Sequence, residues 1–85
     1  MKTFTYTVKD QLGLHARPAG LLATKSAAFQ SKITLSNGVK EADCKKLIRL
    51  LTLGVKQGDK IELKVEGEDE DAAFNDLKAF VEENL

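Results

Sequence analysis

The sequence has one histidine, one cysteine, one proline and no tryptophan. A lone cysteine cannot form an internal disulfide, so the fold has to depend on its hydrophobic core. One histidine and one distant cysteine cannot supply the tetrahedral ligand set of a zinc site, and we predict neither a metal nor another cofactor. We expect Cys44 to be a small core or strand residue rather than a nucleophile, because no second histidine is present to activate it.

Long apolar segments are also absent. No stretch approaches the roughly 20 apolar residues of a transmembrane helix, and the first residues lack the apolar core of a signal peptide. We therefore expect a cytoplasmic protein that does not insert into a membrane. The 85 residues suffice to bury a core, and we expect a single domain over residues 1–85.

Charge is balanced overall but divided along the chain. Eight basic and two acidic residues lie between His15 and Lys56, whereas ten acidic and three basic residues lie from Gln57 to Leu85. The basic half favours an acidic or phosphorylated partner, although segregated charge by itself is equally consistent with a solvated surface. Because the basic half is not interleaved with aromatic residues and the acidic half would repel phosphates, we do not expect nucleic-acid binding.

Hydrophobic patterning predicts the element order βαββαβα. Apolar residues alternate along 2–8 and 60–66, and shorter strands at 32–35 and 39–44 flank an Asn-Gly pair that is typical of tight turns. Apolar spacing of three and four predicts helices over 16–28 and from about 68 onward, and Gly54 suits the end of a short helix over 46–53. We predict a two-layer α+β protein with an antiparallel sheet and all three helices on one face.

The single histidine lies in the hexapeptide GLHARP, residues 13–18. Proline suits the first turn of a helix, so we expect a helix to open at about Ala16 to Pro18 with His15 at its cap. The free N–H groups of that turn, the helix dipole and Arg17 then converge on any anion that the imidazole carries. An isolated histidine is more often a polar cap or a surface residue, but these neighbours favour a site for a phosphoryl group.

The hexapeptide, the Thr52-Leu53-Gly54 segment and the acidic residues after Gly67 resemble the HPr family. These proteins are the small histidine-containing phosphocarriers of the bacterial phosphoenolpyruvate-dependent sugar phosphotransferase system. The resemblance spans the whole chain and implies an open-faced β-sandwich with strand order 1-4-2-3. It also implies a phosphoryl carrier rather than a stand-alone enzyme, and we expect a monomer that works with Enzyme I and Enzyme IIA domains during sugar uptake.

The same resemblance implies a role for each residue of the motif. His15 would accept the phosphoryl group on Nδ1 from Enzyme I and pass it to an Enzyme IIA domain. Arg17 would neutralise the phosphoryl oxygens, and the N–H groups of Ala16 and Arg17 would donate hydrogen bonds to them. Pro18 would set the geometry of the turn.

The predicted helix over 46–53 has apolar residues on nearly all of its sides. Two helical turns cannot bury all of its apolar residues, so some of them either complete the core or form a contact surface. HPr proteins use their first and second helices to dock partners, which favours the contact surface, with Leu47 serving both roles. The residues expected at this surface are Leu21, Leu47, Ile48, Arg49 and Leu51.

One position departs from the family pattern. Many HPr proteins carry a regulatory serine just before this apolar run, whereas this chain has Lys46 there and no serine after Ser36. We therefore do not expect kinase regulation at this position. The sequence leaves two other functions open. The protein could be a paralogue in a nitrogen-related or regulatory phosphorelay, or a non-catalytic regulatory binding module. His15 and Arg17 argue against the binding module.

Overall fold

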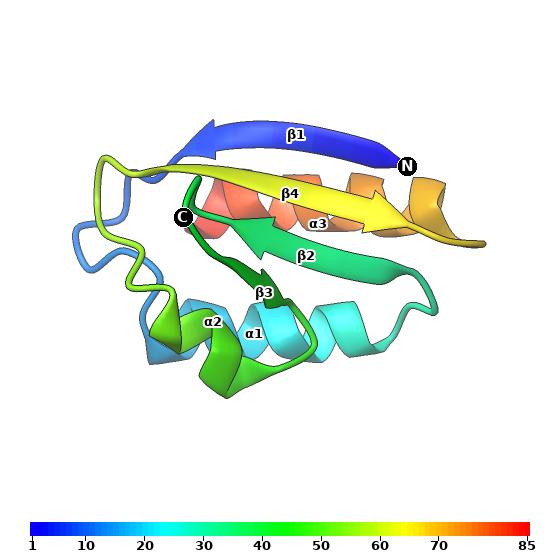
Figure 1. The fold of residues 1–85 in the computed structure, drawn as a ribbon, viewed down its shortest axis with the longest axis horizontal. Coiled ribbons are helices and arrows are strands. Elements are labelled where there is room, and N and C mark those ends of the chain that lie inside the picture. Colours follow the sequence, from blue (N-terminus) through cyan, green and yellow to red (C-terminus); the bar gives the residue numbers. More distant parts are fainter.

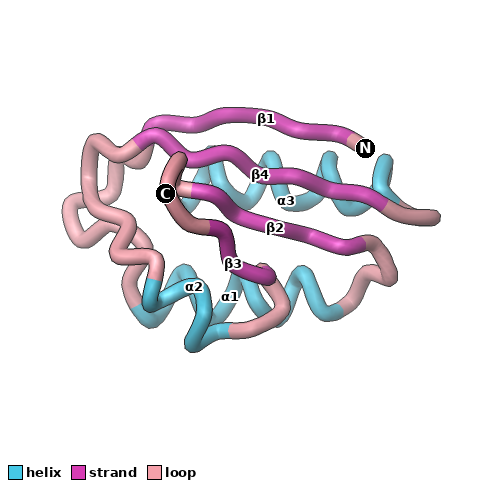
Figure 2. The backbone as a smooth tube through the Cα atoms, in the orientation of Figure 1, coloured by secondary structure: helices cyan, strands magenta, loops and turns pink.

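The computed structural model describes all 85 residues. Its elements are β1 (Lys2–Thr7), α1 (Ala16–Ala27), β2 (Lys32–Ser36), β3 (Glu41–Asp43), α2 (Leu47–Thr52), β4 (Lys60–Glu66) and α3 (Glu70–Asn84). The strands form one antiparallel sheet in the order β1-β4-β2-β3, and the helices lie on one side of it (Figures 1 and 2). The α+β class, the element order and the strand order are thus confirmed.

The core fills the space between the sheet and the helices. Alternate residues of the central strands point into it, including Ile33 on β2 and Leu63 on β4, which are almost completely buried. Leu22 of α1, Leu50 of α2 and Leu77 of α3 are fully buried on the helical side. This single buried layer holds α1 in place, and with it the start of the helix where the histidine lies.

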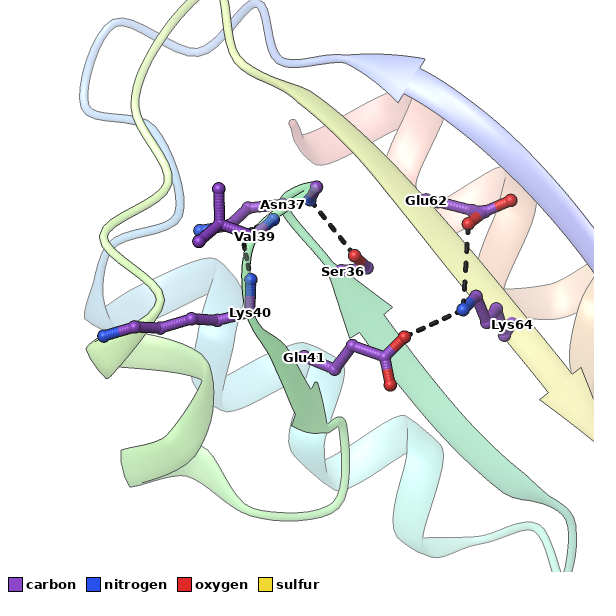
Figure 3. A network of polar contacts seen from close by, with 8 residues as sticks. Ser36, Asn37, Val39, Lys40, Glu41, Glu62 and Lys64 are labelled. Atoms are coloured by element: carbon purple, nitrogen blue, oxygen red, sulfur yellow. Dashed lines mark hydrogen bonds and ion pairs between the residues drawn. The ribbon is translucent and has the colours of Figure 1, made fainter.

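The turn between β2 and β3 differs from its predicted form. We expected a strand over 39–44, but β3 is limited to Glu41–Asp43, and Val39 is 89% exposed. The Asn37 carboxamide oxygen accepts hydrogen bonds from the N–H groups of Val39 and Lys40 at 2.9 and 2.7 Å (Figure 3). These donors are therefore satisfied outside the sheet, and only Gly38 of the Asn-Gly pair has a positive φ.

The opposite face of the sheet is polar. Lys64 on β4 lies between two carboxylates, with its Nζ 2.8 Å from Glu41 of β3 and 3.9 Å from Glu62 (Figure 3). The hydrogen bond and charge of Lys64 lower the pKa of Glu41, and the same contact raises the pKa of Lys64. Because β2 separates β3 from β4, this side chain crosses a whole strand.

The start of α3 is tied to the loop that follows α1. The Asp69 carboxylate accepts hydrogen bonds from the N–H groups of Gln30 and Ser31 at 2.8 and 2.9 Å, and from the Ser31 hydroxyl. Hydrogen bonds from the Ser31 hydroxyl and the Gln30 N–H favour the ionised form and lower the pKa of Asp69. The carboxylate therefore joins two loops that are far apart in the sequence.

This contact predicts a pH-dependent contribution to stability. Since the pKa of Asp69 is lower in the folded protein, the contribution is complete above the ordinary value of 3.8 and is lost as the pH falls through the folded pKa. Asp69→Asn should lower the Tm clearly at pH 7, and the melting curves of the two proteins should converge as the pH falls below that ordinary value. Differential scanning calorimetry from neutral to acidic pH measures this. A Tm difference that stays constant over the range would contradict it.

Candidate functional site

His15 lies where the β1–α1 loop meets the first turn of α1. It is the N-cap of the helix, with φ −96° and ψ −176°, and its side chain forms no capping hydrogen bond. The predicted helix start and cap are confirmed. Among the hydrogen bonds that hold the loop, Gly13 N–H donates to the Asp10 carbonyl at 2.9 Å and Leu14 N–H donates to the Val55 carbonyl at 3.1 Å.

Gly13 is required by this loop for two reasons. Its φ is +66°, and a Cβ atom at this position would lie 2.3 Å from the Val55 carbonyl oxygen and 2.7 Å from the Lys56 Cα. The backbone of the segment before α1 thus packs directly on the segment before β4. This contact fixes where the histidine emerges from the protein.

The first turn of α1 presents free hydrogen-bond donors. Ala19 N–H is the first backbone donor to bond within the turn, to the His15 carbonyl at 3.0 Å, and Pro18 has no N–H. The N–H groups of Ala16 and Arg17 therefore have no partner in the protein. Together with the helix dipole they form a site of positive potential next to the imidazole.

A polar depression surrounds the imidazole. Residues of the β1–α1 loop and α1 form one side of it, and the end of α3 forms the other. The Arg17 side chain is exposed and forms no ion pair, so its guanidinium is available to an incoming anion. The lining residues are Asp10, His15, Arg17, Pro18, Leu21, Glu83 and Asn84.

Three of these residues were not predicted from the sequence. Asp10 lies with its Oδ2 3.8 Å from Nε2 of His15. Its position five residues before the histidine, in the same loop, was an available signal. Glu83 and Asn84 belong to the distant helix α3, and only the tertiary packing brings them to the depression.

The expected contact surface lies on α1 and α2, which pack against each other (Figure 1). Leu21 is 45% exposed, Leu47 38% and Ile48 69%. Leu51 is half-buried and packs on the core. We expected Leu47 to serve both the core and the surface, but Leu51 has that intermediate position instead. We define the exposed set Leu21, Leu47, Ile48 and Arg49 as the apolar patch.

Two further sequence positions have clear surroundings. Lys46 is exposed and is the N-cap of α2, without a side-chain capping bond. Cys44 is completely buried, and burial raises the pKa of its thiol, which keeps it protonated and unreactive. The prediction that Cys44 is a core residue is confirmed. No helix of the protein has the length and apolar character needed to cross a bilayer.

Known proteins share this sequence and fold. A family profile described as the PTS HPr component phosphorylation site matches residues 2–83. The chain is 43% identical to the phosphocarrier protein HPr of Mycoplasma pneumoniae, over 99% of this chain and 97% of the relative. It is 45% identical to the HPr of Lysinibacillus sphaericus, over 98% and 94%. A solved mycoplasma histidine-containing phosphocarrier superposes with a TM-score of 0.91 at 32% identity, over 93% of this chain and 90% of that one.

The open-faced fold and these relatives define the class of small phosphoryl-carrier proteins. The profile covers nearly the whole chain, and the two HPr relatives align with the chain over almost its full length. The chain belongs to the HPr family, and it is a phosphocarrier of the phosphotransferase system.

Proposed function

We propose that His15 carries the phosphoryl group, taking it from Enzyme I and passing it to Enzyme IIA domains during sugar uptake. The observation that supports this most strongly is the position of the only imidazole, at the N-cap of α1 beside two unpartnered N–H groups and an unpaired arginine. The only thiol of the chain, Cys44, has no such surroundings, because it is buried. The acceptor atom in this proposal is Nδ1.

The transfer needs positioning and charge stabilisation more than it needs acid–base catalysis. The Nδ1 lone pair forms the bond to phosphorus while the bond to the donor histidine breaks, and the donor ring keeps that electron pair. The N–H groups of Ala16 and Arg17 and the Arg17 guanidinium stabilise the phosphoryl oxygens. In the onward step a nucleophile of the Enzyme IIA domain forms the bond to phosphorus while the Nδ1–P bond breaks, and Nδ1 keeps the electron pair of that bond. Pro18 keeps the turn in the helical geometry that aims these donors.

The direct test is phosphorylation of the wild-type protein with phosphoenolpyruvate and Enzyme I. Intact-mass measurement should find the addition of one phosphoryl group, and peptide mapping under alkaline conditions, where phosphohistidine survives, should locate it at His15. Omission of Enzyme I is the control. An unchanged mass with Enzyme I of both the sugar and the nitrogen branch would exclude the carrier role of this residue.

The partners of the carrier would dock on the apolar patch. Its exposed leucine and isoleucine side chains adjoin the site, because Leu21 lines the depression around His15 as well. An apolar centre with an arginine beside it suits a transient protein contact. We propose that the protein acts as a monomer in the cytoplasm. Residues 1–85 then form one carrier domain.

The apolar patch leads to a mutational prediction. Ile48→Glu should weaken binding to Enzyme I by at least about 10-fold, because it places a charge in an apolar contact. The Tm should change little, since the side chain is 69% exposed. Thr3→Glu, at an exposed position on the opposite face of the sheet, is the matched charge control. Titration calorimetry measures the affinities. A large fall in Tm with unchanged affinity would assign Ile48 to the core.

Lys46 leads to a prediction about regulation. A kinase that phosphorylates a serine at the start of α2 should not label this protein, because an ammonium group occupies that N-cap. Thr52 is at the far end of the helix, where a phosphate would face the negative end of the dipole. Lys46→Ser should become a substrate. Labelling with ATP and such a kinase tests both proteins, and labelled wild type would contradict the prediction.

A further inference from the structure

The Asp10 carboxylate is held in a fixed orientation beside the histidine. Its backbone N–H donates to the Leu85 backbone oxygen at 2.8 Å, and its carbonyl accepts from Gly13 N–H at 2.9 Å. Its Oδ1 accepts from Leu12 N–H at 2.8 Å. The second oxygen, Oδ2, has no backbone partner and lies 3.8 Å from Nε2 of His15. One oxygen therefore closes the loop, and the other is left for the imidazole.

The position of this oxygen distinguishes the two ring nitrogens. A neutral imidazole has one N–H donor and one lone-pair nitrogen, and an acceptor next to one nitrogen selects the tautomer that has its proton there. Here the carboxylate is next to Nε2, while no protein group bonds to Nδ1. A separation of 3.8 Å is slightly longer than a hydrogen bond, and a small rotation of the ring closes it. The lone pair is then on Nδ1.

We propose that Asp10 is a positioning residue that keeps the proton of His15 on Nε2 and so presents Nδ1 to the phosphoryl group. This inference rests on the proposed function of His15. When Nδ1 forms its bond to phosphorus, the ring becomes positively charged while the Nε2 proton stays, and the Asp10 carboxylate stabilises that charge. When the phosphoryl group leaves, the electron pair of the N–P bond returns to Nδ1 and the ring is neutral again.

The other charged groups of the depression do not take this role. Arg17 is a donor only, so it cannot accept a hydrogen bond from Nε2–H. Glu83 comes from α3 and lies within the depression, but it forms no ion pair with the histidine. Asp10 alone has a carboxylate oxygen within ion-pair distance of the ring.

The chain offers a matched control for the test. Asp43 makes the same turn as Asp10, with its Oδ1 accepting from the N–H two residues later, Lys45, at 2.9 Å. No histidine is near Asp43, because the only one lies next to Asp10. Asp43→Asn therefore reproduces the effect of the substitution on an Asx turn, and it leaves the imidazole unaltered.

The experiment compares wild type, Asp10→Asn and Asp43→Asn by ¹⁵N NMR of the free proteins, which reports which ring nitrogen is protonated. Asp10→Asn keeps an acceptor for Leu12 N–H but turns an amide donor toward Nε2, so the ring should shift toward the Nδ1–H tautomer. The rate of phosphorylation by phosphoramidate, a small donor that releases ammonia and needs no partner, should fall about 10-fold. Asp43→Asn should behave as wild type in both measurements.

The outcomes separate this inference from the proposed function. An unchanged tautomer ratio or an unchanged phosphoramidate rate in Asp10→Asn overturns the role of Asp10, even if Enzyme I phosphorylates the protein normally. A shifted tautomer and a slower rate support it, and they do so even if Enzyme I fails to recognise the wild type, which would overturn only the proposed function. If Asp10→Asn does not fold, Asp10→Ser, which keeps a short acceptor for the turn, should give the same two changes.

Discussion

His15→Ala is expected to gain no phosphoryl group from phosphoenolpyruvate and Enzyme I, and Arg17→Ala is expected to gain one on the order of 100-fold more slowly. The first effect is complete because the chain has no other imidazole. The second follows from the loss of the unpaired guanidinium in the depression, since one preorganised donor to a developing charge contributes roughly 100- to 1,000-fold in rate. Rapid-quench kinetics with intact-mass detection measures both.

Both variants should fold as the wild type does. The His15 side chain makes no capping bond and Arg17 is exposed, so neither substitution leaves a cavity or an unpaired group in the core. Lys25→Ala is the matched control for loss of a cation, because Lys25 is also exposed on α1 but pairs with Asp76 at 3.6 Å. Its transfer rate should stay within about twofold of wild type if local position rather than net charge matters. Equal slowing of the Arg17 and Lys25 variants would remove Arg17 from the mechanism.

Gly13→Ala is expected to destabilise the protein strongly through two separate effects. The φ of +66° alone costs an alanine roughly 1–2 kcal/mol. The new Cβ would also lie 2.3 Å from the Val55 carbonyl oxygen, which is backbone and cannot move away as a flexible side chain would. Such overpacking adds roughly 1–3 kcal/mol. The two effects together predict a loss of about 2–5 kcal/mol.

Gly54→Ala separates these two effects. Gly54 follows α2 with a φ of +67°, but a Cβ there would have no neighbour within 4 Å. This variant should therefore lose only the conformational part, roughly 1–2 kcal/mol. Urea unfolding gives both free energies under one condition. If the two alanine variants lose the same stability, the contact between the β1–α1 loop and Val55 does not constrain the site.

The sequence determined the local parts of this protein. The alternation of apolar and polar residues placed β1 and β4, because successive side chains of a strand point to opposite faces and only one face of this sheet is buried. Pro18 placed the start of α1 and Gly54 placed the end of α2, because a fixed φ and a left-handed φ are properties of single residues. The candidate acceptor His15 and its neighbour Arg17 could be selected for the same reason, since both belong to one short motif.

The tertiary structure decided what lies around that motif. The strand order was available only from the resemblance, because it depends on pairing between β1 and β4, which are far apart in the chain. Glu83 and Asn84 reach the depression because α3 packs beside α1, and no local pattern encodes that contact. The placement of Asp10 beside Nε2 depends on both kinds of contact. The bonds from Leu12 N–H and Gly13 N–H are local, whereas the bonds from Lys9 N–H and Asp10 N–H to the Leu85 backbone oxygen exist only once the loop and Leu85 are packed together.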